Sequence, residues 1–143
     1  MFHYRGAAIR AALEALKGEA GDPYEGVSIR FVNPATGAPV FPTMDYAAQL
    51  LRPGEKTRLK RETANEFYIV LAGEGSTEVG GERFDWREND LFVVPNFRWR
   101  RHLNRGKGDA VLYSVSDRPL LQKIGQYRAQ GRDRDGGLVQ LVA

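Results

Sequence analysis

Charged side chains recur at every second position in two segments, TRLKRE and RWRRHL, whose other residues are typical of β-strands. Successive side chains of a strand point to opposite faces, so each set of charges lies on one face. If both faces line the interior of one domain, these charges must pair, because an unpaired buried charge is strongly destabilising. The residues are Arg58, Lys60 and Glu62 in the first segment and Arg98, Arg100 and His102 in the second.

Two further residues join this predicted group. Glu66 opens the next strand-like segment, EFYIVLA, and Tyr68 lies on the same face of it. We interpret the group as an internal cluster of ion pairs, in which Lys60 and Arg100 pair with the glutamates. An alternative is that the two cations capture a small carboxylate from solution, since charged donors bind carboxylates strongly.

The same positions are poor ligands for a metal ion. Arginine has no lone pair to offer, and lysine must first lose its proton. His102 with Glu62 or Glu66 would make a site of one imidazole and carboxylates, which is weak. We therefore favour a strand histidine that is hydrogen-bonded to its neighbours, and we expect neither a metal site nor a catalytic residue.

The composition is that of one soluble domain. The chain has 143 residues, no cysteine, and 21 lysines and arginines against 18 acidic residues. A net charge of +3 with both signs interspersed does not indicate nucleic-acid binding. No apolar run approaches the roughly 20 residues that a membrane helix needs. We expect a cytoplasmic protein with no nucleic-acid partner and no membrane partner.

The elements that must position the charges are mostly strands. Alternating apolar residues predict a strand at 27–31, and a proline-rich loop follows at 33–43. Two glycines at 80–81 predict a tight hairpin. The many short runs favour a sandwich or a barrel. These runs are 46–51, 57–62, 66–71, 76–79, 82–86, 91–94, 99–103 and 110–115.

Two amphipathic helices flank the β-rich region. Residues 7–17 place apolar side chains at helical spacing among strong helix formers. A second helix is predicted within 116–130, with Asp117 as its N-cap and Pro119 in its first turn. Its apolar stripe is Leu120, Ile124 and Tyr127.

The order of glycines, charges and turns in this region resembles the two motifs of the cupin family. Metal-binding cupins use three histidines and a glutamate, but here lysine, glutamate and arginine stand at the histidine positions. The resemblance implies an all-β double-stranded β-helix, or jelly roll, with flanking N- and C-terminal α-helices. It also implies a degenerate metal site at Lys60, Glu62, Glu66 and Arg100. The matching positions are Gly54, Lys60, Glu62, Glu66 and Gly73 in the first motif and Asn89, Pro95, Phe97, Arg100 and Asn104 in the second.

Three longer segments indicate which members of the cupin family the chain resembles. VNPATGAPVFPTMDYAAQLL, FDWRENDLFVVPNFRWRRH and DAVLYSVSDRPLLQKIG are similar to the second, C-terminal cupin of gentisate 1,2-dioxygenases and related ring-cleaving dioxygenases. In that family the iron and its histidines typically belong to the first cupin, which nothing here matches. The resemblance implies a non-catalytic cupin that acts structurally or in oligomerisation, as a homodimer or beside a partner cupin domain.

Two other functions stay open. In the first, the chain belongs to a gentisate-like dioxygenase, as a piece of a longer polypeptide or with an unusual iron(II) site using His102 and Glu66. In the second, it binds a small aromatic carboxylate at Lys60 and Arg100. No cofactor is expected unless the first holds, and then it is iron(II). We assign residues 1–130 to a single cupin domain and residues 131–143 to a tail that is flexible or pairs with a partner.

Overall fold

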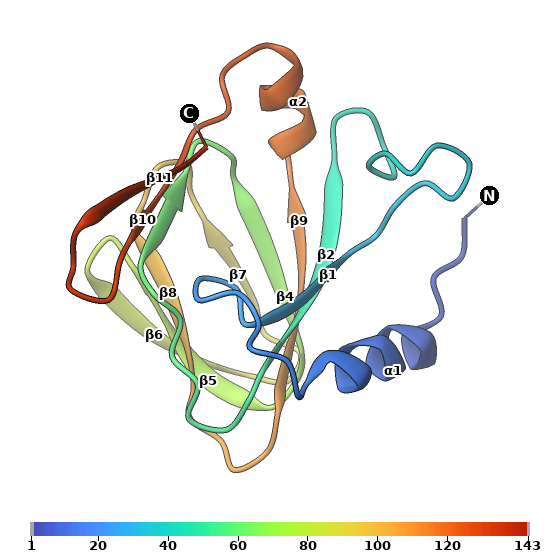
Figure 1. Cartoon of the computed structure of the whole chain (residues 1–143). Coiled ribbons are helices and arrows are strands. Elements are labelled where there is room, and N and C mark those ends of the chain that lie inside the picture. The colour runs from blue at the N-terminus through green and yellow to red at the C-terminus, as the bar shows by residue number, and fades with distance from the viewer. Residues whose placement is uncertain (1, 143) are drawn as a thin grey trace.

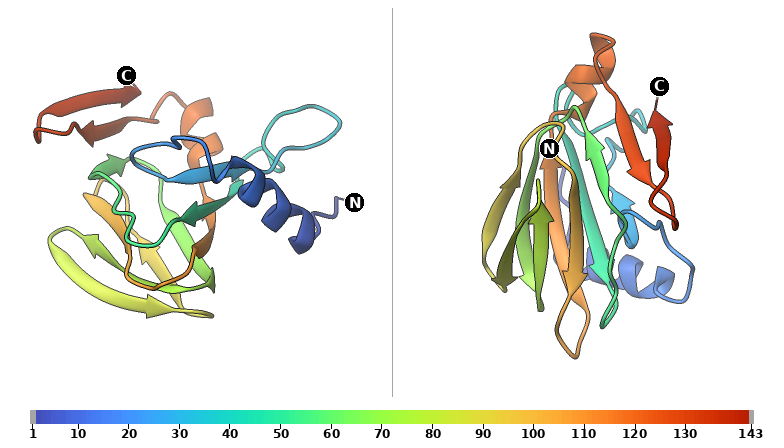
Figure 2. Two further views of the ribbon diagram at one scale, coloured as in Figure 1. Left: turned by 60° about the horizontal axis from the view of Figure 1, so that its bottom comes forward. Right: turned by 90° about the vertical axis from the view of Figure 1, so that its left-hand side faces the viewer.

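The computed structural model describes residues 2–142, which form two antiparallel sheets that face each other (Figure 1, Figure 2). The five-stranded sheet has the order β1-β2-β9-β4-β7, and the six-stranded sheet has the order β11-β10-β3-β8-β5-β6. The strands are β1 Val27–Arg30, β2 Asp45–Leu51, β3 Lys60–Glu62, β4 Glu66–Ala72, β5 Glu74–Val79, β6 Glu82–Arg87, β7 Leu91–Val94, β8 Arg100–Asn104, β9 Ala110–Ser116, β10 Ala129–Arg132 and β11 Leu138–Val142.

The two-residue alternation of the sequence accounts for these strands. In β4, Glu66, Tyr68 and Val70 are buried between the sheets, and the residues between them are more exposed. The all-β prediction is confirmed, and every predicted strand is present, although β3 begins at Lys60 and not at residue 57. The predicted hairpin joins β5 to β6 through Gly80 and Gly81.

Two turn residues support the alignment with the cupin motifs, Asn89 between β6 and β7 and Phe97 between β7 and β8. Asn89 and Phe97 have φ angles of 72° and 56°, in the left-handed region that favours glycine. The second motif has glycine or a turn residue at the first of these positions and glycine at the second. Phe97 thus keeps the motif's backbone conformation, and its N–H donates a hydrogen bond to the carbonyl oxygen of Glu62 at 2.7 Å.

Helix α1 (Gly6–Leu16) covers part of the outer face of the five-stranded sheet, next to β1 and β2 (Figure 1). Leu13 is fully buried there, in one cluster with Val27, Leu50 and Val111, and Ile9 packs against this cluster. The prediction of a helix at 7–17 is therefore confirmed to within one residue. The helix supports the two strands that follow the turn at Asp22–Gly26.

Helix α2 (Arg118–Lys123) is shorter than predicted, and the predicted apolar stripe is wrong. Gly125, at a φ of 70°, follows the end of the helix, so Tyr127 lies beyond it and is buried. Leu120 and Ile124 remain exposed. The carboxylate of Asp117 makes no helix cap, because it accepts hydrogen bonds from the backbone and side chain of Asn65.

The predicted tail continues the six-stranded sheet. Strand β10 pairs with β3 in antiparallel register, with Gly131 opposite Lys60, and β11 pairs with β10 (Figure 1). Strands β10 and β11 therefore form a hairpin within this domain, which is neither the flexible segment nor the partner-pairing segment that the sequence predicts. Leu138 and Val142 on β11 are exposed at the sheet's edge.

The space between the sheets holds an apolar cluster beside a charged one. The apolar cluster is Leu51, Tyr68, Val70, Trp86, Val94, Ala110 and Leu112. Trp86 is buried in it. Within residues 2–142, neither α1 nor α2 has the length and apolar character needed to cross a membrane.

Candidate functional site

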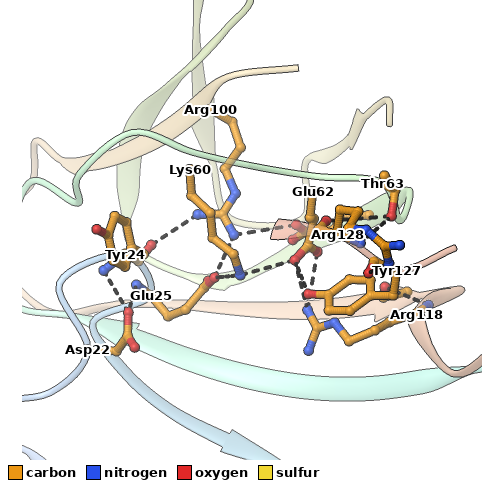
Figure 3. Close-up of polar contacts among 12 residues, drawn as sticks. Asp22, Tyr24, Glu25, Lys60, Glu62, Thr63, Arg100, Arg118, Tyr127 and Arg128 are labelled. Atoms are coloured by element: carbon orange, nitrogen blue, oxygen red, sulfur yellow. Dashed lines mark hydrogen bonds and ion pairs between the residues drawn. The ribbon is translucent and has the colours of Figure 1, made fainter. Parts of the chain in front are cut away.

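The predicted charges meet between the two sheets (Figure 3). Lys60 on β3 and Arg100 on β8 are direct cross-strand partners, so the two cations enter the interior side by side. Arg100 is 1% exposed and Lys60 is 7% exposed. The predicted interior residues that the structure brings together are Lys60, Glu62, Glu66, Tyr68, Arg100 and His102.

Arg58 and Arg98 do not belong to this group, and the prediction that they line the interior is wrong. Both side chains are exposed. The regular alternation begins only at Lys60 and at Arg100, where β3 and β8 start. One residue before Arg58, Thr57 is buried and its N–H donates to the carbonyl oxygen of His102 at 2.9 Å, so the face that points inward has changed.

Glu25 is the central carboxylate of the site, and the sequence reasoning missed it. Its Oε1 atom lies 2.7 Å from Lys60 Nζ and 2.7 Å from Arg100 Nη2 (Figure 3). The residue comes from the turn at Asp22–Gly26, where the Asp22 side chain accepts the N–H groups of Tyr24 and Glu25. Arg100 also donates to the carbonyl oxygen of Tyr24 at 3.0 Å, so the arginine holds the turn at two points.

Glu62 forms the second part of the network, with two partners that the sequence reasoning also missed. Its Oε1 atom accepts from Arg118 Nη2 at 3.2 Å, and its Oε2 atom accepts from the Tyr127 hydroxyl at 2.7 Å (Figure 3). Lys60 Nζ lies 3.1 Å from the same Oε2 atom. Arg118 in turn reaches Asp45 at 3.5 Å.

Glu66 closes the network on the side of β4. Its Oε1 atom lies 3.4 Å from Arg100 Nη2, and its Oε2 atom accepts a hydrogen bond from the Tyr68 hydroxyl. Each of Glu25, Glu62 and Glu66 thus contacts at least one cation. The predicted internal cluster of ion pairs is present, although its central carboxylate differs from the predicted ones.

Burial and pairing act in opposite directions on the pKa values of this network. Burial raises the pKa of Glu25, but Arg100 and Lys60 lower it more, so this pKa lies well below its usual range. Burial lowers the pKa of Lys60, and Glu25 and Glu62 more than reverse that change. Burial and the neighbouring Glu66 raise the pKa of Glu62 to about 8, while Lys60 opposes them. Glu25 and Lys60 are therefore both charged at neutral pH.

His102 is a buried neutral side chain beside the network. Burial and then Arg100 lower its pKa to about 3. Its Nδ1 atom lies 2.8 Å from Thr77 Oγ1, which also accepts a hydrogen bond from Trp86 Nε1 at 2.8 Å. The prediction of a strand histidine that is hydrogen-bonded to its neighbours is confirmed, although its Nε2 atom has no hydrogen-bond partner among residues 2–142.

This donor set does not fit an iron site. Within residues 2–142, no group of three or more histidine, cysteine, aspartate or glutamate side chains is placed to hold a metal ion. Lys60 and Arg100 both remain protonated beside Glu25, and two positive charges repel a dication. The imidazole of His102 lies next to Arg100, which disfavours any added positive charge there.

Only part of the missed network carried a sequence signal. Glu25 lies in a turn, DPYEG, and no periodicity relates a turn residue to strands that follow much later. Arg118 and Tyr127 both fall within the helix predicted at 116–130. The structure ends that helix before Gly125, so Tyr127 lies outside it and can contact Glu62. A glycine between Ile124 and Tyr127 was the available signal for that helix end.

Comparison with known proteins identifies relatives of this chain and its fold. A family model described as a cupin domain matches residues 48–116. A 5-aminosalicylate 1,2-dioxygenase of Comamonas sp is 40% identical over 132 residues, and a gentisate 1,2-dioxygenase of Haloferax sp is 41% identical over 107 residues. A crystal structure of salicylate 1,2-dioxygenase from Pseudoaminobacter salicylatoxidans superposes with a TM-score of 0.82 at 27% identity.

The chain matches only part of each relative. The match covers 91% of this chain and 35% of the Comamonas protein, 74% and 29% for the Haloferax protein, and 92% and 37% for the salicylate dioxygenase. The chain therefore spans about a third of the length of the relatives that it matches.

Proposed function

Because this chain is a cupin that resembles gentisate and salicylate 1,2-dioxygenases, we propose that it is a non-catalytic cupin module with a role in structure and assembly. The observation that carries this proposal is the ion-pair network at the degenerate metal-ligand positions. Lys60 and Arg100 stand at two of these positions and contact Glu62 and Glu66 at the other two, and both cations also contact Glu25 from the turn at Asp22–Gly26. Such a network leaves its buried charges paired and offers no open coordination position for oxygen.

The outer face of the five-stranded sheet supports the assembly part of the proposal. Phe67 and Val93 are cross-strand partners there, and so are Ile69 and Leu91. Leu91 is 59% exposed and Val93 is 54% exposed, and Phe67 is exposed beside them. Contiguous exposed apolar side chains on one face indicate an interaction surface. The partner is a second copy of this chain, since most soluble oligomers are symmetric homo-oligomers.

An oxygen-consumption assay tests the non-catalytic role. The chain is purified without chelator, supplied with iron(II), and mixed with gentisate in an oxygen electrode, with the same iron(II) solution alone as the control. We expect the protein to add nothing to the oxygen consumption of that control. Oxygen consumption that depends on both the protein and gentisate contradicts the proposal.

A second candidate function is ring cleavage by an iron dioxygenase to which this chain contributes. The observation that favours it is the 40% identity to the 5-aminosalicylate 1,2-dioxygenase over 91% of this chain. In that case the remaining two thirds of such a protein would supply the iron site, and this cupin would support it. Iron content and gentisate-dependent oxygen consumption then appear together, and only when that remaining part is present.

A further inference from the structure

Two buried cations converge on one carboxylate oxygen. Lys60 Nζ and Arg100 Nη2 each lie 2.7 Å from Glu25 Oε1, and these are the shortest ion pairs that either cation makes. Short charge-assisted bonds from two donors to one oxygen are the pattern by which proteins bind carboxylates. The geometry is therefore that of an anion-binding site that is already filled.

The cations and the carboxylate belong to different parts of the fold. Lys60 and Arg100 are paired across β3 and β8 in the interior of the barrel. Glu25 comes from the turn at Asp22–Gly26, and its side chain is 20% exposed, against 9% for Lys60 and 2% for Arg100. The barrel thus supplies the binding groups, and a turn at the surface supplies the anion.

We propose that Lys60 and Arg100 form a binding site for a small carboxylate, and that Glu25 occupies it as a built-in ligand. The site is separate from the apolar face assigned to assembly. In the wild-type protein the glutamate excludes carboxylates from solution, because it is tethered at the site and so has a high effective concentration there.

The surroundings define the size of the anion that fits. A cavity of about 50 Å³ lies on one side of Glu25 and is also lined by Glu66, Ser116 and Arg118, but neither Lys60 nor Arg100 is among its lining residues. It is large enough for a water molecule and too small for an aromatic ring. Removing the side chain beyond Cβ of Glu25 opens a further space equal to one methylene and one carboxylate, which is the size of acetate.

The test is chemical rescue of Glu25→Ala by acetate. This variant leaves Lys60 and Arg100 with a vacant position, so we expect its thermal unfolding temperature to fall well below that of the wild type. Added sodium acetate should raise the temperature by on the order of several degrees, in a saturable manner. Acetamide, which has the same shape without the charge, and sodium chloride at equal ionic strength are the control solutes.

Two further variants separate this site from general salt effects. Glu78→Ala removes a surface carboxylate that also lies 2.7 Å from an arginine, Arg101, and acetate should give it no more stabilisation than chloride. Glu25→Ala combined with Lys60→Met removes one of the two binding cations, so the acetate effect should be lost. If Glu25→Ala is unfolded in buffer, the same measurement becomes recovery of folding when acetate is added.

Each outcome decides the proposal. Saturable rescue of Glu25→Ala by acetate, absent with acetamide and in the double variant, supports the anion site. Equal effects of acetate and chloride on Glu25→Ala, or failure of acetate to restore folding, overturn it. A saturable acetate effect of the same size on the wild type overturns the built-in role of Glu25.

Discussion

Charged side chains in the barrel interior depend on their ion-pair partners, because burial alone destabilises a charge. Arg100 illustrates this, because it is almost completely buried and contacts Glu25, Glu66 and the carbonyl oxygen of Tyr24. A buried ion pair contributes little compared with apolar residues of the same volume, but removing one partner leaves an uncompensated charge. The cost of a substitution in the network therefore depends on the charge that is left behind.

Replacement of Arg100 tests this at the residue scale. Arg100→Met leaves the Glu25 and Glu66 carboxylates short of a cation, and we expect the free energy of unfolding to fall by about 3–5 kcal/mol. The matched control is Arg98→Met, two residues earlier and exposed, which should change it by no more than about 0.5 kcal/mol. Urea unfolding followed by tryptophan fluorescence measures both. Equal losses in the two variants contradict the central role of Arg100.

His102 predicts a pH dependence whose sign follows from its lowered pKa. In the unfolded chain the imidazole binds a proton near pH 6.5, whereas in the folded protein it does so only near pH 3. Between these values the unfolded state binds more protons, so this residue makes the folded state less stable as the pH falls. The contribution is about 1.4 kcal/mol per pH unit at most.

The measurement is the unfolding free energy of the wild type minus that of His102→Leu at several pH values. This difference isolates His102, because Glu62, with its raised pKa, titrates in both proteins and changes stability in the opposite sense. We expect the difference to be constant above pH 7 and to fall steadily from pH 6.5 to pH 4. A difference that does not change with pH means that His102 is not buried in its neutral form.

Strand periodicity at the residue scale predicted part of the site and could not predict the rest. It placed Lys60, Glu62 and Arg100 inside correctly, because β3 and β8 are regular from those residues onward. It placed Arg58 and Arg98 inside wrongly, since both precede the regular strands. Strand periodicity could not predict Glu25, because the contact between its turn and a distant strand depends on tertiary structure.

At the scale of elements, the turn at Asp22–Gly26 is what delivers Glu25 to the barrel. Gly26 has a φ of 72°, and a Cβ atom there would lie 2.9 Å from the carbonyl oxygen of Leu50 and 2.9 Å from Leu51 Cδ2. Gly37 has a similar φ of 69°, but a Cβ atom would meet nothing within 4 Å. The two glycines therefore differ in available space and share the same backbone conformation.

This pair of glycines gives a matched test of the turn. Gly37→Ala should cost only the strain of the left-handed conformation, about 1–2 kcal/mol. Gly26→Ala adds the collision with β2, so its loss of unfolding free energy should exceed that of Gly37→Ala clearly. Chemical denaturation of both variants measures this difference. Equal losses of unfolding free energy in the two variants would contradict this expectation, because they would mean that the turn at Asp22–Gly26 can move away from β2 at no cost.

The helices and the tail show why some elements were misjudged from sequence. The stripe of Leu120, Ile124 and Tyr127 has helical spacing, but the chain leaves the helix at Gly125 and turns Tyr127 inward to Glu62. The tail is predicted to begin at residue 131, yet Gly131 pairs with Lys60 of β3, and β11 pairs with β10. Tertiary contacts decided both structures, although Gly125 was a local signal for the end of the helix.

At the scale of the whole molecule, the jelly roll itself was predictable. The short alternating strands, the GG hairpin and the spacing of the cupin motifs all indicated a jelly roll. Agreement among strand pattern, turn residues and motif spacing is what specifies a fold. The exposed outer face of the five-stranded sheet was not predictable, because the strand pattern does not show how far α1 extends over that face. That face leads to a prediction about assembly.

We expect the chain to form a homodimer through the outer face of the five-stranded sheet. Leu91→Lys places a charge in the exposed apolar surface and should shift the dimer to a monomer. Leu120→Lys on α2 is the matched control, since Leu120 is exposed elsewhere, and it should leave the dimer intact. Light scattering at micromolar concentration measures the molar mass. A wild-type protein that is monodisperse as a monomer contradicts the prediction.

The central claim is that paired charges stand at Lys60, Glu62, Glu66 and Arg100, the positions that correspond to the ligands in the motifs of metal-binding cupins. The most direct measurement is an anomalous difference map, recorded at the iron absorption edge, from crystals soaked in iron(II). We predict no iron peak between Lys60, Glu66 and Arg100, and electron density for the Glu25 carboxylate in contact with both cations. An iron peak at that position, with Glu25 displaced, would contradict the account.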